Sequence, residues 1–213
     1  MINNKIIEDM LMNDKYKSDE GYLIRKGNDV ILISAPHSVT QYRDGKIKKG
    51  EFRTGSIAEI LHKKLNTNIA IKTKNLNDDA NYDKESIYKN AIRDFILNND
   101  VKLLLDIHIA SSKRKFHIDI GTGYGKNIKG RFDCLNIILD NFKKSCYEAY
   151  VDNVFAASNI NTVSAFIAET CNIPTFQFEI NWNCIENDEK LFKFIECMEQ
   201  IIDKLREVVW MDG

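Results

Sequence analysis

Short apolar runs alternate along this chain with longer segments in which apolar residues recur every three or four positions. The first pattern predicts buried strands and the second predicts amphipathic helices. Strands that alternate with helices favour an α/β fold, a three-layer sandwich whose mixed, mostly parallel sheet carries helices on both faces. Strands are expected at 29–34, 68–72, 101–107, 116–120, 150–155 and 174–180, and helices at 85–97, 134–144, 162–171 and 188–208.

A local signal marks the start of one more helix. Ser56 is followed three residues later by Glu59, which is the spacing of a capping box, so a helix is expected to begin at Ser56. The segment 75–83 is polar and rich in turn-forming residues and predicts a loop. No repeat and no linker rich in Pro, Gly or Ser divides the 213 residues, so a single domain over 1–213 is expected.

Composition and charge narrow the class of protein. Hydrophobic residues make up 44% of the chain and charged residues 29%, which is typical of a globular protein. The 30 Lys and Arg residues nearly balance the 31 Asp and Glu residues, so neither a nucleic-acid partner nor a membrane surface is indicated. No apolar run approaches the ~20 residues of a membrane span, and the first 17 residues lack the apolar core of a signal peptide. A cytoplasmic location is therefore expected.

The cysteines exclude two further classes. They are odd in number and no pair has C-x-x-C spacing, which argues against a disulfide framework and against a cysteine-ligated zinc site. Reduced thiols are expected at all five positions: Cys134, Cys146, Cys171, Cys184 and Cys197.

Polar residues at the ends of predicted strands are the candidates for chemistry. His37 and His108 each follow an apolar strand, and Glu179 lies near the end of a third. In open α/β sheets, ligands bind outside the carboxyl ends of the strands. Asp106 lies two residues before His108, on the same side of the strand, and can orient that histidine as a supporting carboxylate.

These residues can supply the parts of a catalytic zinc site. Two histidines and a carboxylate are a standard ligand set, with an open position for water, and a separate glutamate can act as general base. His37 and His108 are the candidate ligands and Glu179 is the candidate base. Each also has an ordinary interpretation: a loop histidine, a hydrogen-bonded core histidine, and a carboxylate that pairs with a basic side chain.

Four short motifs occur in a fixed order over about residues 30–185 and together resemble the N-formylglutamate amidohydrolase family. They are Ala35-Pro36-His37-Ser38, Asp79-Ala80-Asn81, Leu105-Asp106-Ile107-His108 and Phe176-Gln177-Phe178-Glu179-Ile180-Asn181. The resemblance implies a fold similar to the zinc carboxypeptidases and the cleavage of an N-acyl (N-formyl) amino acid or a short peptide. It also implies that His37 and His108 bind zinc, that Glu179 is the base, and that Ser38, Asn81 and Asn181 contact the substrate.

The third metal ligand departs from the related pattern. Zinc carboxypeptidases have a glutamate three residues after the first histidine, where this chain has Thr40. We favour Glu51, which precedes the predicted helix and can fold back, and Asp44 and His117 remain alternatives. The remaining histidine, His62, lies among lysines and is expected at the surface.

The carboxylate-binding position also departs from the family. Tyr82 follows Asn81 where the family tends to have an arginine. Because arginine binds carboxylates in a bidentate manner, Arg53 and Arg93 are the candidates to replace it. The sequence therefore favours a zinc-dependent amidohydrolase. A catalytically degenerate binding protein on the same fold is the alternative. A metal-independent hydrolase that uses Ser38 or a cysteine ranks below both, because no G-x-S-x-G elbow is present.

Overall fold

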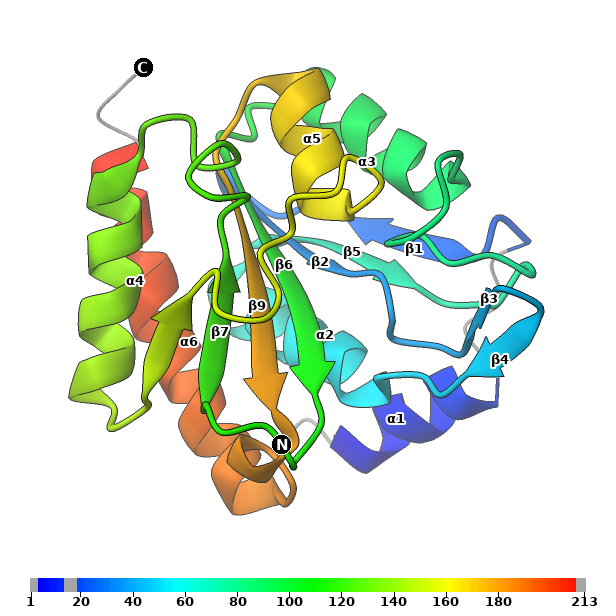
Figure 1. Ribbon diagram of the computed structural model, residues 1–213, viewed down its shortest axis with the longest axis horizontal. Coiled ribbons are helices and arrows are strands. Elements are labelled where there is room, and N and C mark those ends of the chain that lie inside the picture. Colours follow the sequence, from blue (N-terminus) through cyan, green and yellow to red (C-terminus); the bar gives the residue numbers. More distant parts are fainter. Residues whose placement is uncertain (1–3, 14–18, 210–213) are drawn as a thin grey trace.

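A seven-stranded sheet forms the centre of the computed structural model, which describes residues 4–13 and 19–209 (Figure 1). The strand order is β1-β5-β2-β6-β9-β7-β8. The four strands β5, β2, β6 and β9 are parallel, β1 and β7 run antiparallel to their neighbours β5 and β9, and β8 is parallel to β7. The predicted mixed, mostly parallel sheet is confirmed. The strands are β1 (Tyr22–Arg25), β2 (Ile31–Ala35), β5 (Asn68–Lys72), β6 (Leu103–Ala110), β7 (Ile118–Gly121), β8 (Ala149–Val151) and β9 (Thr175–Asn181).

Helices cover both faces of the sheet, as the three-layer prediction requires. One face packs against α1, α2, α4 and α6, and the other packs against α3 and α5. No helix within the described residues is both long and apolar enough to cross a membrane. The helices are α1 (Asn4–Met12), α2 (Phe52–Leu65), α3 (Ile87–Leu97), α4 (Phe132–Lys144), α5 (Val163–Cys171) and α6 (Asp188–Val209).

Alternation along the strands decides where polar groups lie. In β6, Leu103, Leu105 and Ile107 belong to the core beneath α2 and α6, whereas Leu104 belongs to the core beneath α3 and α5. Because successive side chains point to opposite faces of a sheet, Asp106 and His108 share the face of Leu104. The polar residues of β6 therefore lie on the face that only two helices cover.

Two expected boundaries are wrong and have clear physical reasons. Strand β6 runs on to Ala110, so His108 lies inside the strand and not beyond its end, because residues 104–110 all pair with β9. Helix α2 begins at Phe52, four residues before Ser56, because the Thr54 amide and hydroxyl both donate to the Glu51 carbonyl. Ser56 is consequently a buried residue inside the helix and not its cap.

Strand β8 is shorter than expected. It ends at Val151, since the amides of Asn153, Val154 and Phe155 donate to the buried carboxylate of Asp119 in place of a strand partner. Some short elements have no counterpart among the sequence predictions. These are α1, β1, a hairpin of β3 (Gln41–Arg43) and β4 (Lys46–Lys48), and the 3-10 turn η1 (Trp182–Cys184).

Candidate metal centre

The candidate site lies where the strand order changes direction. From β2 the chain crosses to β5 on one side, and it later returns to β6 on the other side. The carboxyl ends of two such strands leave a crevice between their outgoing connections, which is where ligands bind in open α/β sheets. His37 lies two residues after β2 and His108 lies in the neighbouring strand β6, so the topology brings the two histidines together.

Glu51 reaches this crevice because the chain after His37 turns back on itself. The Glu51 amide donates to the His37 carbonyl at 2.7 Å. Gly50 makes this close approach possible, since a Cβ at that position would lie 2.6 Å from the carbonyl carbon of Val39. Glu51 then immediately precedes α2, and its Oε2 accepts the Ile109 amide at 2.8 Å. A residue fourteen positions along the chain is thereby fixed beside His37.

The three side chains present a compact set of ligand atoms. His37 Nδ1 lies 3.1 Å from Glu51 Oε1 and 3.2 Å from His108 Nδ1, and His108 Nδ1 lies 3.6 Å from Glu51 Oε2. Ligand atoms around a tetrahedral zinc ion at about 2.0 Å lie roughly 3.3 Å apart. The spacing therefore fits a zinc ion, with a fourth position left for water or substrate.

Two buried carboxylates support the histidines from behind. Asp79 Oδ1 lies 2.9 Å from His37 Nε2, and Asp106 Oδ2 lies 3.1 Å from His108 Nε2. An ionised carboxylate only accepts hydrogen bonds, so these contacts place a proton on each Nε2. In neutral rings both Nδ1 atoms then carry lone pairs that face each other, an arrangement that a bound cation stabilises.

The charges of the site favour a positive charge at these two nitrogens. Burial raises the pKa of Glu51, but the two histidines outweigh burial and lower it to about 2. Burial lowers the pKa of His37 and of His108, but Glu51 and the supporting aspartates outweigh burial and raise both. Protons and a metal ion would compete for the same Nδ1 atoms.

The alternative third ligands lie elsewhere. Asp44 is exposed and accepts a hydrogen bond from the Tyr82 hydroxyl, and His117 is exposed with its Nδ1 accepting the Glu148 amide. Over residues 4–13 and 19–209, the cluster with metal-ligand spacing is His37, Glu51 and His108.

Glu179 faces the same crevice from β9, where it pairs in register with His108. Its side chain is 7% exposed, and Gln177 Nε2 donates to its Oε1 at 3.1 Å. Burial raises the pKa of Glu179 to about 7, the nearby histidines oppose this rise, and Glu51 adds to it. A carboxyl group with a pKa near neutrality can both accept and donate a proton, as a general base and acid must.

A cavity of about 470 Å³ opens above the cluster and is lined by His37, Glu51 and Glu179. Residues 154–159 also line it, and the Asp119 carboxylate holds the start of this segment through the amides of Asn153, Val154 and Phe155. Arg43 and Arg114 also line this cavity. Arg43 donates to Asp79 Oδ2 at 2.8 Å, with its guanidinium over the Tyr82 ring.

The predicted substrate-binding residues separate into two groups. Asn81 lines the cavity, although its Oδ1 accepts the Val163 amide. Ser38 and Asn181 are not among the residues that line this cavity. The Ser38 hydroxyl is buried and donates to the carbonyls of Ala35 and Lys72. The Asn181 amide group donates to the carbonyls of Arg114 and Phe116. Both hold the backbone in place.

The two arginines proposed for carboxylate binding lie outside this cavity. Arg53 lines a neighbouring cavity, where it pairs with Glu8, and Arg93 pairs with Asp94 on α3. The sequence did not point to Arg43, Arg114 or Gln177 as residues of the site. It also did not indicate that Asp79 supports His37. Asp79 belongs to the D-x-N motif and Gln177 to the Q-x-E-I-N motif. Both could therefore be found in the sequence, but their roles could not be assigned from it.

The fold and the cluster define the class: an α/β sandwich with a candidate metal centre at the carboxyl ends of its central parallel strands. No family model and no curated protein matches the chain. Solved structures do match. An N-formylglutamate amidohydrolase from Ralstonia eutropha JMP134 has a TM-score of 0.60 at 10% identity, covering 91% of this chain and 100% of that one.

Two other solved structures have the same architecture. A bacteriophage poly-gamma-glutamate hydrolase has a TM-score of 0.55 at 10% identity, covering 92% of this chain and 95% of that one. A putative carboxypeptidase A from Shewanella denitrificans OS-217 has a TM-score of 0.52 at 12% identity, covering 86% of this chain and 61% of that one. At such identity the comparisons show a shared fold, which confirms the predicted α/β, carboxypeptidase-like architecture.

Proposed function

We propose that this protein is a zinc-dependent amidohydrolase that cleaves the amide bond of an N-acyl amino acid or a short peptide. One observation carries the proposal. Two buried histidines direct their Nδ1 atoms at each other, 3.2 Å apart, beside Glu51, while a buried carboxylate holds each Nε2. The names of two structures with the same fold, an amidohydrolase and a poly-gamma-glutamate hydrolase, agree with it.

The residues divide the work as follows. His37, Glu51 and His108 would hold the ion, and Asp79 and Asp106 keep a proton on each Nε2, so that Nδ1 is the nitrogen that would bind it. A zinc ion held by these residues would supply Lewis-acid activation of the substrate carbonyl and of water. Glu179, oriented by Gln177, accepts the proton of the attacking water and delivers it to the leaving nitrogen.

Metal binding and hydrolysis are tested separately. Metal-free protein is titrated with zinc, and the loaded protein is then screened against N-acyl amino acids and dipeptides. His108→Ala should lose high-affinity zinc binding, because it removes one of three ligands. Glu179→Gln should keep zinc and lose about 10²–10⁴-fold in kcat, because it removes only the proton acceptor.

His117→Ala is the matched control, since His117 is an exposed histidine outside the cluster. It should leave both zinc affinity and turnover unchanged. Failure of the wild-type protein to bind zinc at micromolar concentrations would refute the proposal. Zinc binding without hydrolysis of any tested amide would instead support the alternative, a catalytically degenerate binding protein.

A further inference from the structure

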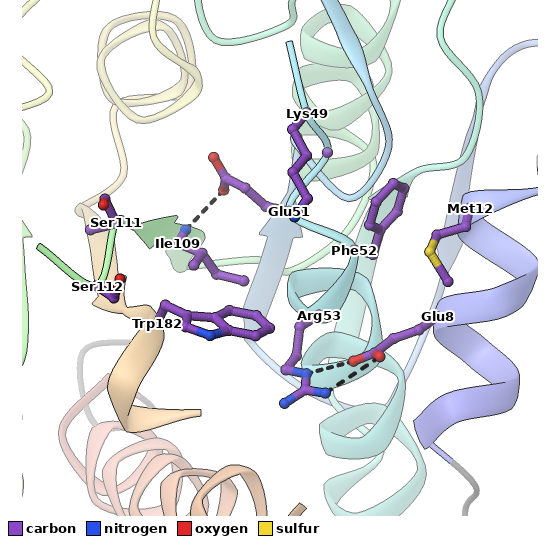
Figure 2. A pocket seen from close by; sticks show the side chains of 12 residues that line it. Glu8, Met12, Lys49, Glu51, Phe52, Arg53, Ile109, Ser111, Ser112 and Trp182 are labelled. Carbon is purple, nitrogen blue, oxygen red and sulfur yellow. Dashed lines mark hydrogen bonds and ion pairs between the residues drawn. The ribbon is translucent and has the colours of Figure 1, made fainter. Parts of the chain in front are cut away.

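A second cavity, of about 610 Å³, is shown in Figure 2, and it adjoins the one above the metal cluster. The two cavities share a wall that contains Lys49, Glu51 and Ile109. Glu51 is the candidate metal ligand, so the second cavity begins at the candidate metal centre itself. A substrate whose reacting carbonyl lies beside Glu51 can therefore extend into both cavities.

The side walls of the second cavity are apolar. Trp182 and Ile109 lie on one side, and Phe52 and Met12 lie on the other. Trp182 is 38% exposed and Met12 is 50% exposed, which is high for residues of this size and polarity. Water contact with such side chains is unfavourable, and an apolar group placed between them would remove it.

Of the charged side chains that line this cavity, Arg53 and Glu8 are paired with each other, and Lys49 and Glu51 lie on the wall shared with the first cavity. The Arg53 guanidinium donates to Glu8 Oε1 at 2.6 Å and to the Ile185 carbonyl, and it lies 5.1 Å from the centre of the Trp182 ring. The cavity above the cluster differs, since Arg43 and Arg114 line it together with Lys48. One cavity thus suits an anionic group and the other suits an apolar one.

We propose that the second cavity is the subsite for a large apolar acyl group of the substrate. This inference rests on the proposed amidohydrolase function. The carboxylate of the leaving amino acid would lie among the basic residues of the first cavity. The acyl chain would then pass Glu51 and lie against Trp182. A formyl group would leave this space empty, so the substrate class is an amino acid or peptide whose acyl side carries a long-chain or aromatic group.

The first test varies the acyl group at constant leaving group. The zinc-loaded enzyme is assayed with N-formyl-, N-butanoyl- and N-octanoyl-glutamate. We expect kcat/KM to rise by about fourfold for each added methylene until the cavity is filled. Trp182→Ala should remove most of the advantage in kcat/KM that the octanoyl substrate has over the formyl substrate. Phe192→Ala is the matched control, because Phe192 is an exposed aromatic residue on α6 that lines neither cavity.

The second test does not depend on turnover. The sequence contains two tryptophans, Trp182 and Trp210, so a Trp210→Phe variant reports on Trp182 alone. In the presence of a chelator, N-octanoyl-glutamate should give a saturable change in Trp182 emission and N-formyl-glutamate should give none. Chain-length-dependent binding without hydrolysis by the zinc-loaded enzyme would overturn the proposed function and keep the subsite. Hydrolysis or binding that is independent of acyl length would overturn the subsite.

Discussion

Replacing Asp79 with asparagine changes one oxygen of a buried carboxylate into an NH₂ group without changing the size of the side chain. Asp79 Oδ1 accepts from His37 Nε2 at 2.9 Å and from the Asn81 amide at 3.0 Å, and Oδ2 accepts from Arg43 Nε at 2.8 Å. An asparagine has a single accepting oxygen. Its NH₂ group must therefore face either Arg43 or His37.

Both orientations weaken the candidate metal centre. If the NH₂ group faces Arg43, two donors meet and Arg43 loses its partner. If it faces His37, the ring Nε2 must accept, and the ring proton moves to Nδ1, where it blocks the metal. Loss of such a supporting carboxylate typically costs 10–100-fold in metal affinity, or about 1.4–2.7 kcal/mol. We also expect the free energy of unfolding of the metal-free protein to fall by about 3 kcal/mol, because the carboxylate is fully buried and charged partners remain.

Competition against a zinc-binding dye measures the affinity, and urea unfolding in a chelator measures the stability of the same samples. Asp78→Asn is the matched control: the Asp78 carboxylate pairs with Lys72 and makes no bond to His37. It should cost stability and keep the zinc dissociation constant within twofold. A dissociation constant for Asp79→Asn within twofold of the wild-type value would refute the reasoning about the tautomer of His37.

Two further predictions concern stability. Arg206 Nη2 donates to the fully buried carboxylate of Asp29 at 2.6 Å, so Arg206→Ala should lower the free energy of unfolding by about 3 kcal/mol. Arg93→Ala, which breaks the exposed pair with Asp94, should lower the free energy of unfolding by less than about 0.5 kcal/mol in the same urea experiment. Equal losses in the two variants would contradict the conclusion that burial decides what each ion pair contributes. Burial raises the pKa of Glu179 from 4.5 to about 7, so the metal-free native state holds a proton that the unfolded state releases, and stability should fall as pH rises from about 5 to 7. Glu179→Gln should flatten this fall by roughly 3 kcal/mol, and an unchanged pH slope would show that Glu179 does not titrate in this range.

Much of the site could be predicted because its residues occupy positions that the hydrophobic pattern defines. Apolar runs located β2, β6 and β9, and the polar residues His37, His108 and Glu179 stood out at their ends. Glu51 could be favoured but not fixed. Its place depends on the close approach at Gly50, which is a tertiary contact that no periodicity reports.

The remaining residues could not be predicted, for a related reason. Arg43 enters the site from a short hairpin whose strands have only three residues each, too short for a clear pattern. It stacks on Tyr82, the residue that occupies the position expected for an arginine. A guanidinium thus lines the cavity, but from a residue earlier in the chain. For Ser38 and Asn181, a place in a motif indicated contact with substrate, which stays a prediction, and both side chains bind backbone carbonyls.

The charge balance of the candidate metal centre indicates that its carboxyl groups and histidines act together. Four carboxyl groups lie in this centre. Those of Asp79, Asp106 and Glu179 belong to residues that are at most 7% exposed, and that of Glu51 contacts the buried His37. Arg43 is the one basic side chain bonded to any of them, apart from the two histidines, among the contacts described for this cluster. Burying several carboxyl groups together is costly unless cations or protons accompany them. A divalent cation would offset that cost at the point where both Nδ1 atoms and Glu51 meet. Metal binding would therefore stabilise the fold as well as enable the chemistry, and the supporting aspartates would contribute to both.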